Sequence, residues 1–168
     1  NNAAAALELA AQLCLFKSDD EVIIPAHTYT ASAYPFLKKG AKIVWADIDL
    51  KTRVVNAKTI ENCITKKTKA IVVVHLYGYG IDMPEIMSLA KKYKLIVVED
   101  TAQALGVTIN DKKAGTYGDF GIFSFQSQKN ISTLGEGGML VVKNDELAKL
   151  IPMLRHNGHC SFNFDRKK

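Results

Sequence analysis

The sequence predicts an α/β domain in which helices flank a mostly parallel β-sheet. Short apolar runs rich in Val and Ile alternate along the chain with segments of helical periodicity. This alternation is typical of βαβ units, whose strands run parallel. The composition, 48% hydrophobic and 23% charged over 168 residues, is that of one globular domain with a substantial core.

Each expected element has a local reason. Apolar, β-branched runs predict strands at residues 21–25, 41–46, 70–75, 95–99, 121–125 and 139–142. Apolar residues at helical spacing predict helices at residues 2–15, 28–39, 57–64, 83–93 and 146–155. Pro35 is expected to make the second helix irregular, Asp82 to cap the fourth, and Asp145 to open the last. Glycines between residues 106 and 121 predict short strands and turns.

Charge and cysteine content narrow the class of protein. The net charge of +5 is spread along the chain without a long basic cluster, so nucleic-acid binding is not predicted, and anionic small molecules are equally compatible. Cys14, Cys63 and Cys160 are odd in number and far apart, which favours a reducing, cytoplasmic setting over a disulfide framework. No apolar run approaches the roughly 20 residues of a membrane span.

Neither a metal site nor a dinucleotide site is predicted. The nearest approach to a metal motif, residues 156–160, places two histidines and a cysteine together but lacks further ligands at suitable spacing. No GxGxxG motif follows a strand, and no GxSxG elbow is present. Since the chain lacks an initiating Met and opens directly in helix-like sequence, we expect residues 1–168 to be a fragment of a longer protein.

Several reactive residues fall where an open parallel sheet binds its ligands, beyond the carboxyl ends of the strands. Asp100 follows one expected strand, Ser124 lies at the end of another, and Lys129 comes soon after it. Tyr29 follows the strand that ends at Pro25. Taken singly, each has an ordinary explanation: a helix cap, an alternating strand position, a solvated surface amine, or a core or rim aromatic.

Taken together, these residues match the needs of pyridoxal phosphate (PLP). A lysine forms a Schiff base with the cofactor aldehyde, and a carboxylate at a strand end keeps a pyridine nitrogen protonated. A hydroxyl group and the backbone amides at a helix start hold a phosphate. The sequence therefore favours a PLP site at this edge of the sheet.

Four sequence motifs, in a fixed order along the chain, indicate a family of PLP-dependent proteins. The sequence resembles the DegT/DnrJ/EryC1/StrS family of PLP-dependent nucleotide-sugar aminotransferases over about residues 2–158. The resemblance is carried by VVEDTAQA at residues 97–104, by GTYGDFGIFSF followed by Lys129 and GEGGM at residues 115–139, by PAHTYTA at residues 25–31, and by HLYGYGIDM at residues 75–83.

The resemblance implies a fold and a role for each matching residue. The fold is the large domain of fold type I PLP-dependent transferases, with a mostly parallel seven-stranded sheet flanked by helices. Lys129 would form the Schiff base and Asp100 would pair with the pyridine nitrogen. Gln103 would contact the phenolic oxygen side, Tyr29 would stack on the ring, and Ser124 would bind the phosphate.

Two departures from the family pattern concern completeness. The family carries Asn-Gly-Thr before the first helix, where this chain has alanines, so the backbone amides of Ala3 and Ala4 would have to serve the phosphate. The family's carboxyl-terminal small domain, and the later asparagine that reaches the neighbouring subunit's cofactor, are absent from this sequence. We therefore expect the 168 residues by themselves to be inactive, and the full-length protein to be a homodimer.

The resemblance implies transfer of an amino group from L-glutamate to a nucleotide-linked keto-sugar, in aminosugar, cell-surface polysaccharide or antibiotic sugar biosynthesis. A PLP-dependent sugar dehydratase is the first alternative, but those family members carry histidine where this chain has Lys129. A non-catalytic sugar-nucleotide-binding domain on the same scaffold is the second alternative. The presence of Lys129, Asp100 and Gln103 together disfavours it.

Overall fold

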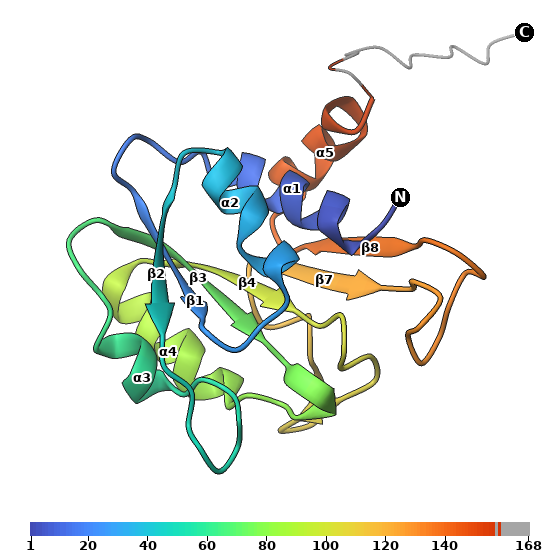
Figure 1. Ribbon diagram of the computed structural model, residues 1–168. Helices are drawn as coiled ribbons and strands as arrows, with labels where there is room; N and C mark the ends of the chain where they lie inside the picture. The colour runs from blue at the N-terminus through green and yellow to red at the C-terminus, as the bar shows by residue number, and fades with distance from the viewer. Residues whose placement is uncertain (157, 159–168) are drawn as a thin grey trace, which may run out of the picture.

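The computed structural model describes residues 1–156 and 158. Its centre is one mixed sheet with the strand order β2-β1-β3-β4-β7-β8 (Figure 1). Five of these strands are parallel, and β8 pairs antiparallel with β7 at the edge. The strands are β1 (Glu21–Pro25), β2 (Lys42–Ala46), β3 (Thr68–Val74), β4 (Ile96–Asp100), β7 (Phe120–Ser124) and β8 (Gly138–Val142).

The α/β class expected from the sequence is confirmed, with one strand fewer in the described sheet than the seven that the resemblance implies. The glycine-rich region adds no further sheet strand, because β5 (Thr108–Ile109) and β6 (Lys112–Lys113) pair with each other as a separate antiparallel ribbon. The lysines of β6 are exposed, and burying them between two helical layers would be costly.

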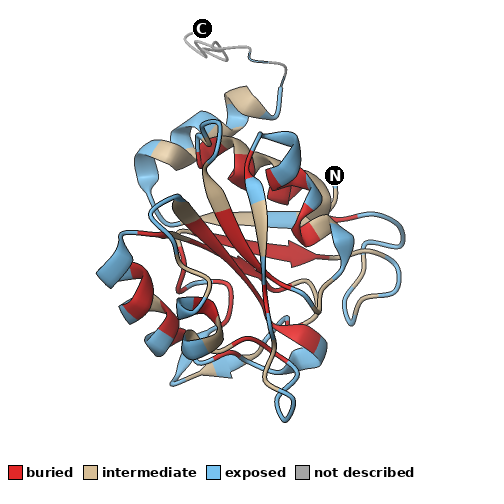
Figure 2. Ribbon diagram, turned by 60° about the vertical axis from the view of Figure 1, so that its left-hand side comes forward, coloured by how far each residue is buried: buried red, intermediate tan, exposed pale blue. Residues whose placement is uncertain are grey.

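Two helical layers cover the sheet (Figure 1). Helices α1 (Ala3–Leu13) and α2 (Tyr34–Lys38) lie on one face, and α3 (Ala57–Glu61) and α4 (Met83–Tyr93) lie on the other. The last helix, α5 (Asp145–Leu154), packs beside α1 and β8. Figure 2 shows that the central strands and the inner helix faces are buried, whereas the outer helix faces are exposed. The Val- and Ile-rich strands are therefore buried on both faces, as a parallel sheet requires.

Local chemistry sets where the helices start. Asn2 caps α1, since its Oδ1 accepts a hydrogen bond from the Ala5 N–H at 2.9 Å. Asp82 caps α4 as predicted, by accepting from the Glu85 N–H at 3.2 Å. The cap of α5 is Asn144 rather than Asp145, because the Asn144 Oδ1 accepts from the first-turn N–H groups. Asp145 instead places its negative charge in the first turn, which the helix dipole favours.

The helix predicted over residues 28–39 is interrupted. The chain forms a 3₁₀ turn, η1 (Thr30–Ser32), and then the short helix α2. Pro35 occupies the first turn of α2, where its missing N–H costs nothing, and this position ends the preceding turn. The predicted irregularity is confirmed. As a consequence, the segment after β1 lies along the carboxyl edge of the sheet.

Candidate active site

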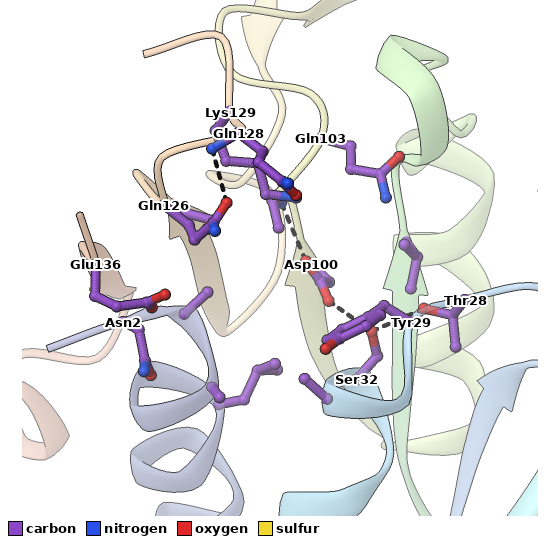
Figure 3. Close-up of a pocket in the computed structure, with 17 residues that line it drawn as sticks. Asn2, Thr28, Tyr29, Ser32, Asp100, Gln103, Gln126, Gln128, Lys129 and Glu136 are labelled. Carbon is purple, nitrogen blue, oxygen red and sulfur yellow. Dashed lines mark hydrogen bonds between the residues drawn. The ribbon is translucent and has the colours of Figure 1, made fainter. Parts of the chain in front are cut away.

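A cavity of about 520 Å³ opens at the carboxyl edge of the sheet (Figure 3). It lies between the start of α1, the segment after β1, and the ends of β4 and β7. All seven residues predicted for the site line it, namely Ala3, Ala4, Tyr29, Asp100, Gln103, Ser124 and Lys129. Residues that are up to 126 positions apart in the chain therefore face one space.

Asp100, the last residue of β4, lies at the base of this cavity and is 5% exposed. Its Oδ2 accepts a hydrogen bond from the Ser32 hydroxyl at 2.7 Å, and its Oδ1 accepts from the Ala102 N–H at 3.0 Å. Asp100 caps no helix: the next residues form a turn. Burial raises the pKa of Asp100, although the Ser32 and Ala102 hydrogen bonds and the charge of Lys129 act in the opposite direction.

Two donors to Asp100 leave acceptor capacity unused. A carboxylate has about four lone-pair positions, and two are taken here. Because the residue is nearly buried and lines the cavity, the remaining positions can be reached by a donor inside it. A cationic N–H in this space would compensate the desolvation of the carboxylate.

Gln103 forms the adjacent wall, and its amide has a defined orientation. Its Oε1 accepts a hydrogen bond from the Tyr77 N–H at 3.1 Å. Tyr77 belongs to the short turn η2 (Leu76–Gly78), where it has a positive φ of 54°. With the oxygen engaged, the Gln103 side chain presents its NH₂ donors to an oxygen acceptor in the cavity (Figure 3).

The amino end of α1 forms the opposite wall. The N–H groups of a first helical turn have no acceptor within the helix, and together with the helix dipole they favour an anion. Asn2 satisfies the Ala5 N–H, and Ala3 and Ala4, the first residues of this turn, line the cavity. Gly138 lets β8 approach this helix start, since a Cβ there would lie 2.3 Å from the Asn2 carbonyl carbon. Ser124 adds a hydroxyl at the end of β7.

Lys129 lies in the loop that follows β7. Its N–H donates to the Gln126 carbonyl at 2.8 Å, and the loop is also held by a hydrogen bond of 2.8 Å from the Phe125 N–H to the Gly137 carbonyl. The side chain of Lys129 is half-buried and lines the cavity with Asp100. Tyr29 lies across the cavity with its side chain 72% exposed, at the rim rather than in the core.

Behind this site lies a second carboxylate, Glu99, which is fully buried. It accepts hydrogen bonds from His75 Nε2 at 3.1 Å and from the N–H groups of Gly115, Tyr117 and Gly118 at 2.6 to 2.8 Å. Burial acts to raise its pKa, but the hydrogen bonds from His75, Gly118 and Gly115 outweigh burial, and the pKa of Glu99 lies below its ordinary value.

The protonation of His75 follows from its contacts. Its Nδ1 faces the Ile81 N–H at 3.1 Å and is the acceptor there, so Nε2 carries the proton that Glu99 accepts. His75 is a satisfied core residue and does not line the cavity.

Sequence reasoning missed two hydroxyl residues of the site, Thr28 and Ser32, which line the cavity beside Asp100. Thr28 lies in the PAHTYTA motif at residues 25–31, in which only Tyr29 has a predicted role. Ser32 was predicted to lie within a continuous helix, and the break at η1 is what turns it toward Asp100. Asn2, Gln126, Gln128 and Glu136 also line the cavity without having been predicted.

Among residues 1–156 and 158, no group of three or more His, Cys, Asp or Glu side chains is placed to hold a metal ion. Part of the 156–160 motif lies outside the described residues. No helix in the described part of the chain is long and apolar enough to cross a membrane.

Comparison with known sequences supplies the family. The sequence profile of the DegT/DnrJ/EryC1/StrS aminotransferase family matches residues 1–168. The chain belongs to this family. The resemblance noted in the four motifs is thereby confirmed.

Individual family members show the extent of the similarity. The UDP-N-acetyl-3-dehydro-α-D-glucosamine 3-aminotransferase of Acidithiobacillus ferrooxidans is 44% identical over 153 residues, which are 91% of this chain and 42% of that protein. The structure of S. venezuelae DesV in complex with a ketimine intermediate matches with a TM-score of 0.90 and 35% identity, over 100% of this chain and 45% of that one.

A third relative has a different reaction. A GDP-4-keto-6-deoxymannose-3-dehydratase with a trapped PLP-glutamate geminal diamine matches with a TM-score of 0.87 and 30% identity, over 93% of this chain and 42% of that one. The family scaffold therefore hosts both aminotransferases and dehydratases. The chain spans about two fifths of the length of these relatives.

Proposed function

We propose that this chain forms the cofactor-binding part of a PLP-dependent aminotransferase that acts on a nucleotide-linked keto-sugar, with L-glutamate as the amino donor. The observation that carries the proposal is the convergence of Lys129, Asp100, Gln103 and Ser124 with the start of α1 on one cavity. Family membership and the named relatives support the same conclusion.

The cavity fits PLP group by group. Asp100 is a buried acceptor for a cationic ring N–H, and the NH₂ of Gln103 is a donor for the phenolic oxygen. Ser124 and the N–H groups of Ala3 and Ala4 provide donors for the phosphate. Tyr29 lies at the rim, where an aromatic ring can cover the face of the bound ring.

PLP, when bound, supplies an aldehyde that condenses with amines and a ring that accepts electrons. Asp100 keeps a proton at the ring nitrogen, and its low-dielectric surroundings strengthen that ion pair. The Nζ of Lys129 would hold the cofactor through its aldehyde, and as a free amine it would take up the proton that leaves the donor's α-carbon and deliver it to the cofactor. The surrounding hydroxyl and amide donors keep the reacting groups oriented.

We further propose that the full-length protein is a cytoplasmic homodimer, and exposed apolar side chains on two segments next to the site support the assembly. Tyr77 and Tyr79 at η2, and Ile131 and Leu134 in the loop that carries Lys129, are large apolar side chains that are more than half exposed. Large exposed apolar side chains on neighbouring loops are typical of a surface that a partner covers. Light scattering of the full-length protein measures its mass, and a monomer would contradict this assembly.

The proposal is tested by trapping the lysine in the full-length protein. We expect PLP to give a visible absorption band, and borohydride reduction to leave the cofactor covalently bound to the peptide that contains Lys129. Lys129→Ala should abolish the band and the transfer of nitrogen from glutamate. Lys91→Ala, on an exposed position of α4, should change neither.

A panel of nucleotide-linked keto-sugars then separates the two family reactions. An aminated product supports the proposal, and a deoxygenated sugar without nitrogen supports the dehydratase. A protein that binds the sugar nucleotide but never the cofactor would contradict both reactions. It would support the remaining alternative, a non-catalytic sugar-nucleotide-binding domain.

A further inference from the structure

Two hydroxyl groups connect the cavity wall to the carboxylate of Asp100. The Ser32 Oγ lies 2.7 Å from Asp100 Oδ2, and the Thr28 Oγ1 lies 2.7 Å from the Ser32 Oγ (Figure 3). Ser32 is 1% exposed, so no solvent competes for its hydroxyl group. Residues 28 and 32 belong to the segment after β1, whereas Asp100 ends β4.

The direction of this hydrogen-bonded chain follows from proton counting. An ionised carboxylate can only accept, so the single hydroxyl proton of Ser32 is donated to Asp100. The Ser32 Oγ is then free only as an acceptor, and the Thr28 hydroxyl donates to it. Hydrogen bonds in such a chain polarise one another, which strengthens the donor that reaches the carboxylate.

The carboxylate is held at both oxygens by different parts of the fold. The Ala102 N–H, just beyond β4, holds Oδ1, and Ser32, from the segment after β1, holds Oδ2. Two donors on separate oxygens restrict rotation about the terminal bond of the Asp100 side chain. Removal of the Ser32 hydroxyl would leave the buried Oδ2 of Asp100 without its donor.

We propose that Ser32, supported by Thr28, is a positioning residue that aims the Asp100 carboxylate into the cavity and keeps it ionised for a cationic ring nitrogen. This proposal rests on the proposed function, because it assumes that the ligand presents such a nitrogen to Asp100. Ser32 acts through Asp100, so its removal should weaken recognition of the ring nitrogen and spare recognition of the phosphate.

Other charged groups also act on Asp100 and must be held constant. The charge of Lys129, from the loop after β7, lowers its pKa in the same direction as Ser32, and His75, at the end of β3, is held by Glu99 and the Ile81 N–H. Glu99 precedes Asp100 but is enclosed by its own donors. The test therefore changes the hydroxyl groups only and leaves these charges in place.

The experiment compares PLP with 1-deaza-PLP, in which a carbon replaces the ring nitrogen, by titration of the full-length apoprotein. The measured quantity is the ratio of the two dissociation constants. In the wild type this ratio should favour PLP, and in Asp100→Asn the preference should nearly vanish. We expect Ser32→Ala to reduce the preference about tenfold, Thr28→Val to reduce it about threefold, and Ser32→Thr to restore most of it.

Thr101→Val is the matched control. Its hydroxyl is the buried side-chain group next to Asp100 for which no hydrogen-bond partner exists in the described part of the chain. Loss of this hydroxyl removes no donor to the carboxylate, so the preference for PLP should stay at the wild-type value. If Ser32→Ala proves unstable, Thr28→Val, on the half-buried wall, carries the test by itself.

The outcomes distinguish a failure of the positioning role of Ser32 from a failure of the pairing between Asp100 and the ring nitrogen. An unchanged preference in Ser32→Ala or Thr28→Val, with the expected loss in Asp100→Asn, overturns the positioning role and leaves the proposed function standing. Equal affinities for both compounds in the wild type overturn the pairing of Asp100 with the ring nitrogen, and the role of Ser32 with it. A preference for PLP that falls progressively from Thr28→Val to Ser32→Ala to Asp100→Asn supports the hydrogen-bonded chain from Thr28 through Ser32 to Asp100.

Discussion

Glu99 and Asp100 are consecutive carboxylates at the end of β4, yet their surroundings differ. Successive side chains of a strand point to opposite faces, so Glu99 faces the loop that begins near Gly115 and Asp100 faces the cavity. Glu99 accepts from four donors, whereas Asp100 accepts from two. The pKa is lowered at Glu99 and raised at Asp100.

The comparison teaches how a buried carboxylate is recognised as structural or functional. Burial penalises both charges, but Glu99 is compensated by the protein itself, because its own donors stabilise the charged form within the fold. Asp100 is left undercompensated beside a cavity, a state that a cationic ligand would relieve. Depth of burial alone does not separate them, since both are buried.

The largest effect is expected from Asp100→Asn in the full-length protein. The variant keeps the size of the side chain but loses the charge that holds a proton on the ring nitrogen. We expect the transamination rate to fall at least roughly a thousandfold, which corresponds to about 4 kcal/mol of transition-state stabilisation. Urea unfolding should show little loss of stability, because an undercompensated buried charge has been removed. Near-normal turnover would contradict the assignment.

Glu99→Gln should reverse that pattern, with stability lost first. The amide nitrogen of Gln would face N–H donors that Glu99 now accepts from, so at least one buried N–H is left unsatisfied. We expect a loss of about 3 kcal/mol in the free energy of unfolding. Denaturant titration of the full-length variant measures it, with Thr101→Val as a neighbouring control. An unchanged midpoint would mean that the donors around Glu99 contribute nothing.

Acidification should change the contributions of the two carboxylates to folding stability in opposite directions. The pKa of Glu99 is depressed, so its contribution is present above its unfolded value of 4.5 and is lost as the pH falls through the folded pKa. The pKa of Asp100 is raised above 3.8, so stability of the ligand-free protein falls as the pH rises from that value through the folded pKa.

Unfolding curves of the ligand-free protein at a series of pH values test this. The stability gap between wild type and Glu99→Gln should narrow on acidification. Asp100→Asn should gain on the wild type as the pH rises from 3.8. Parallel pH profiles for both variants and the wild type would show that neither carboxylate has the environment described.

The smallest effect on stability is expected at a third carboxylate, Asp82, which is not buried. It is exposed and caps α4 through the Glu85 N–H. Asp82→Ala should cost about 1 kcal/mol, the usual value for a lost helix cap. Asp82→Asn, which keeps the capping oxygen, should cost much less. Thermal unfolding of both variants measures the difference, and equal losses would show that the cap is not the cause.

Local chemistry made most of the elements predictable. The strand predicted at residues 21–25 is observed with the same bounds, because a β-branched run before Pro25 has few alternatives to a buried strand. The helix predicted at residues 83–93 is also observed unchanged, since Asp82 defines its start. The prediction at residues 28–39 was wrong in its middle, because propensity cannot show where a chain turns to cover a cavity.

The sequence by itself determined the alternation of strands and helices, and with it the edge at which Lys129, Asp100 and Ser124 gather. Those features depend on neighbouring residues and on the common direction of parallel strands. Only the tertiary structure decided that Glu99 is enclosed and Asp100 is not, and that Ser32 reaches Asp100 across 68 residues. Such contacts depend on where distant segments of the backbone meet, and no local sequence pattern specifies where they meet.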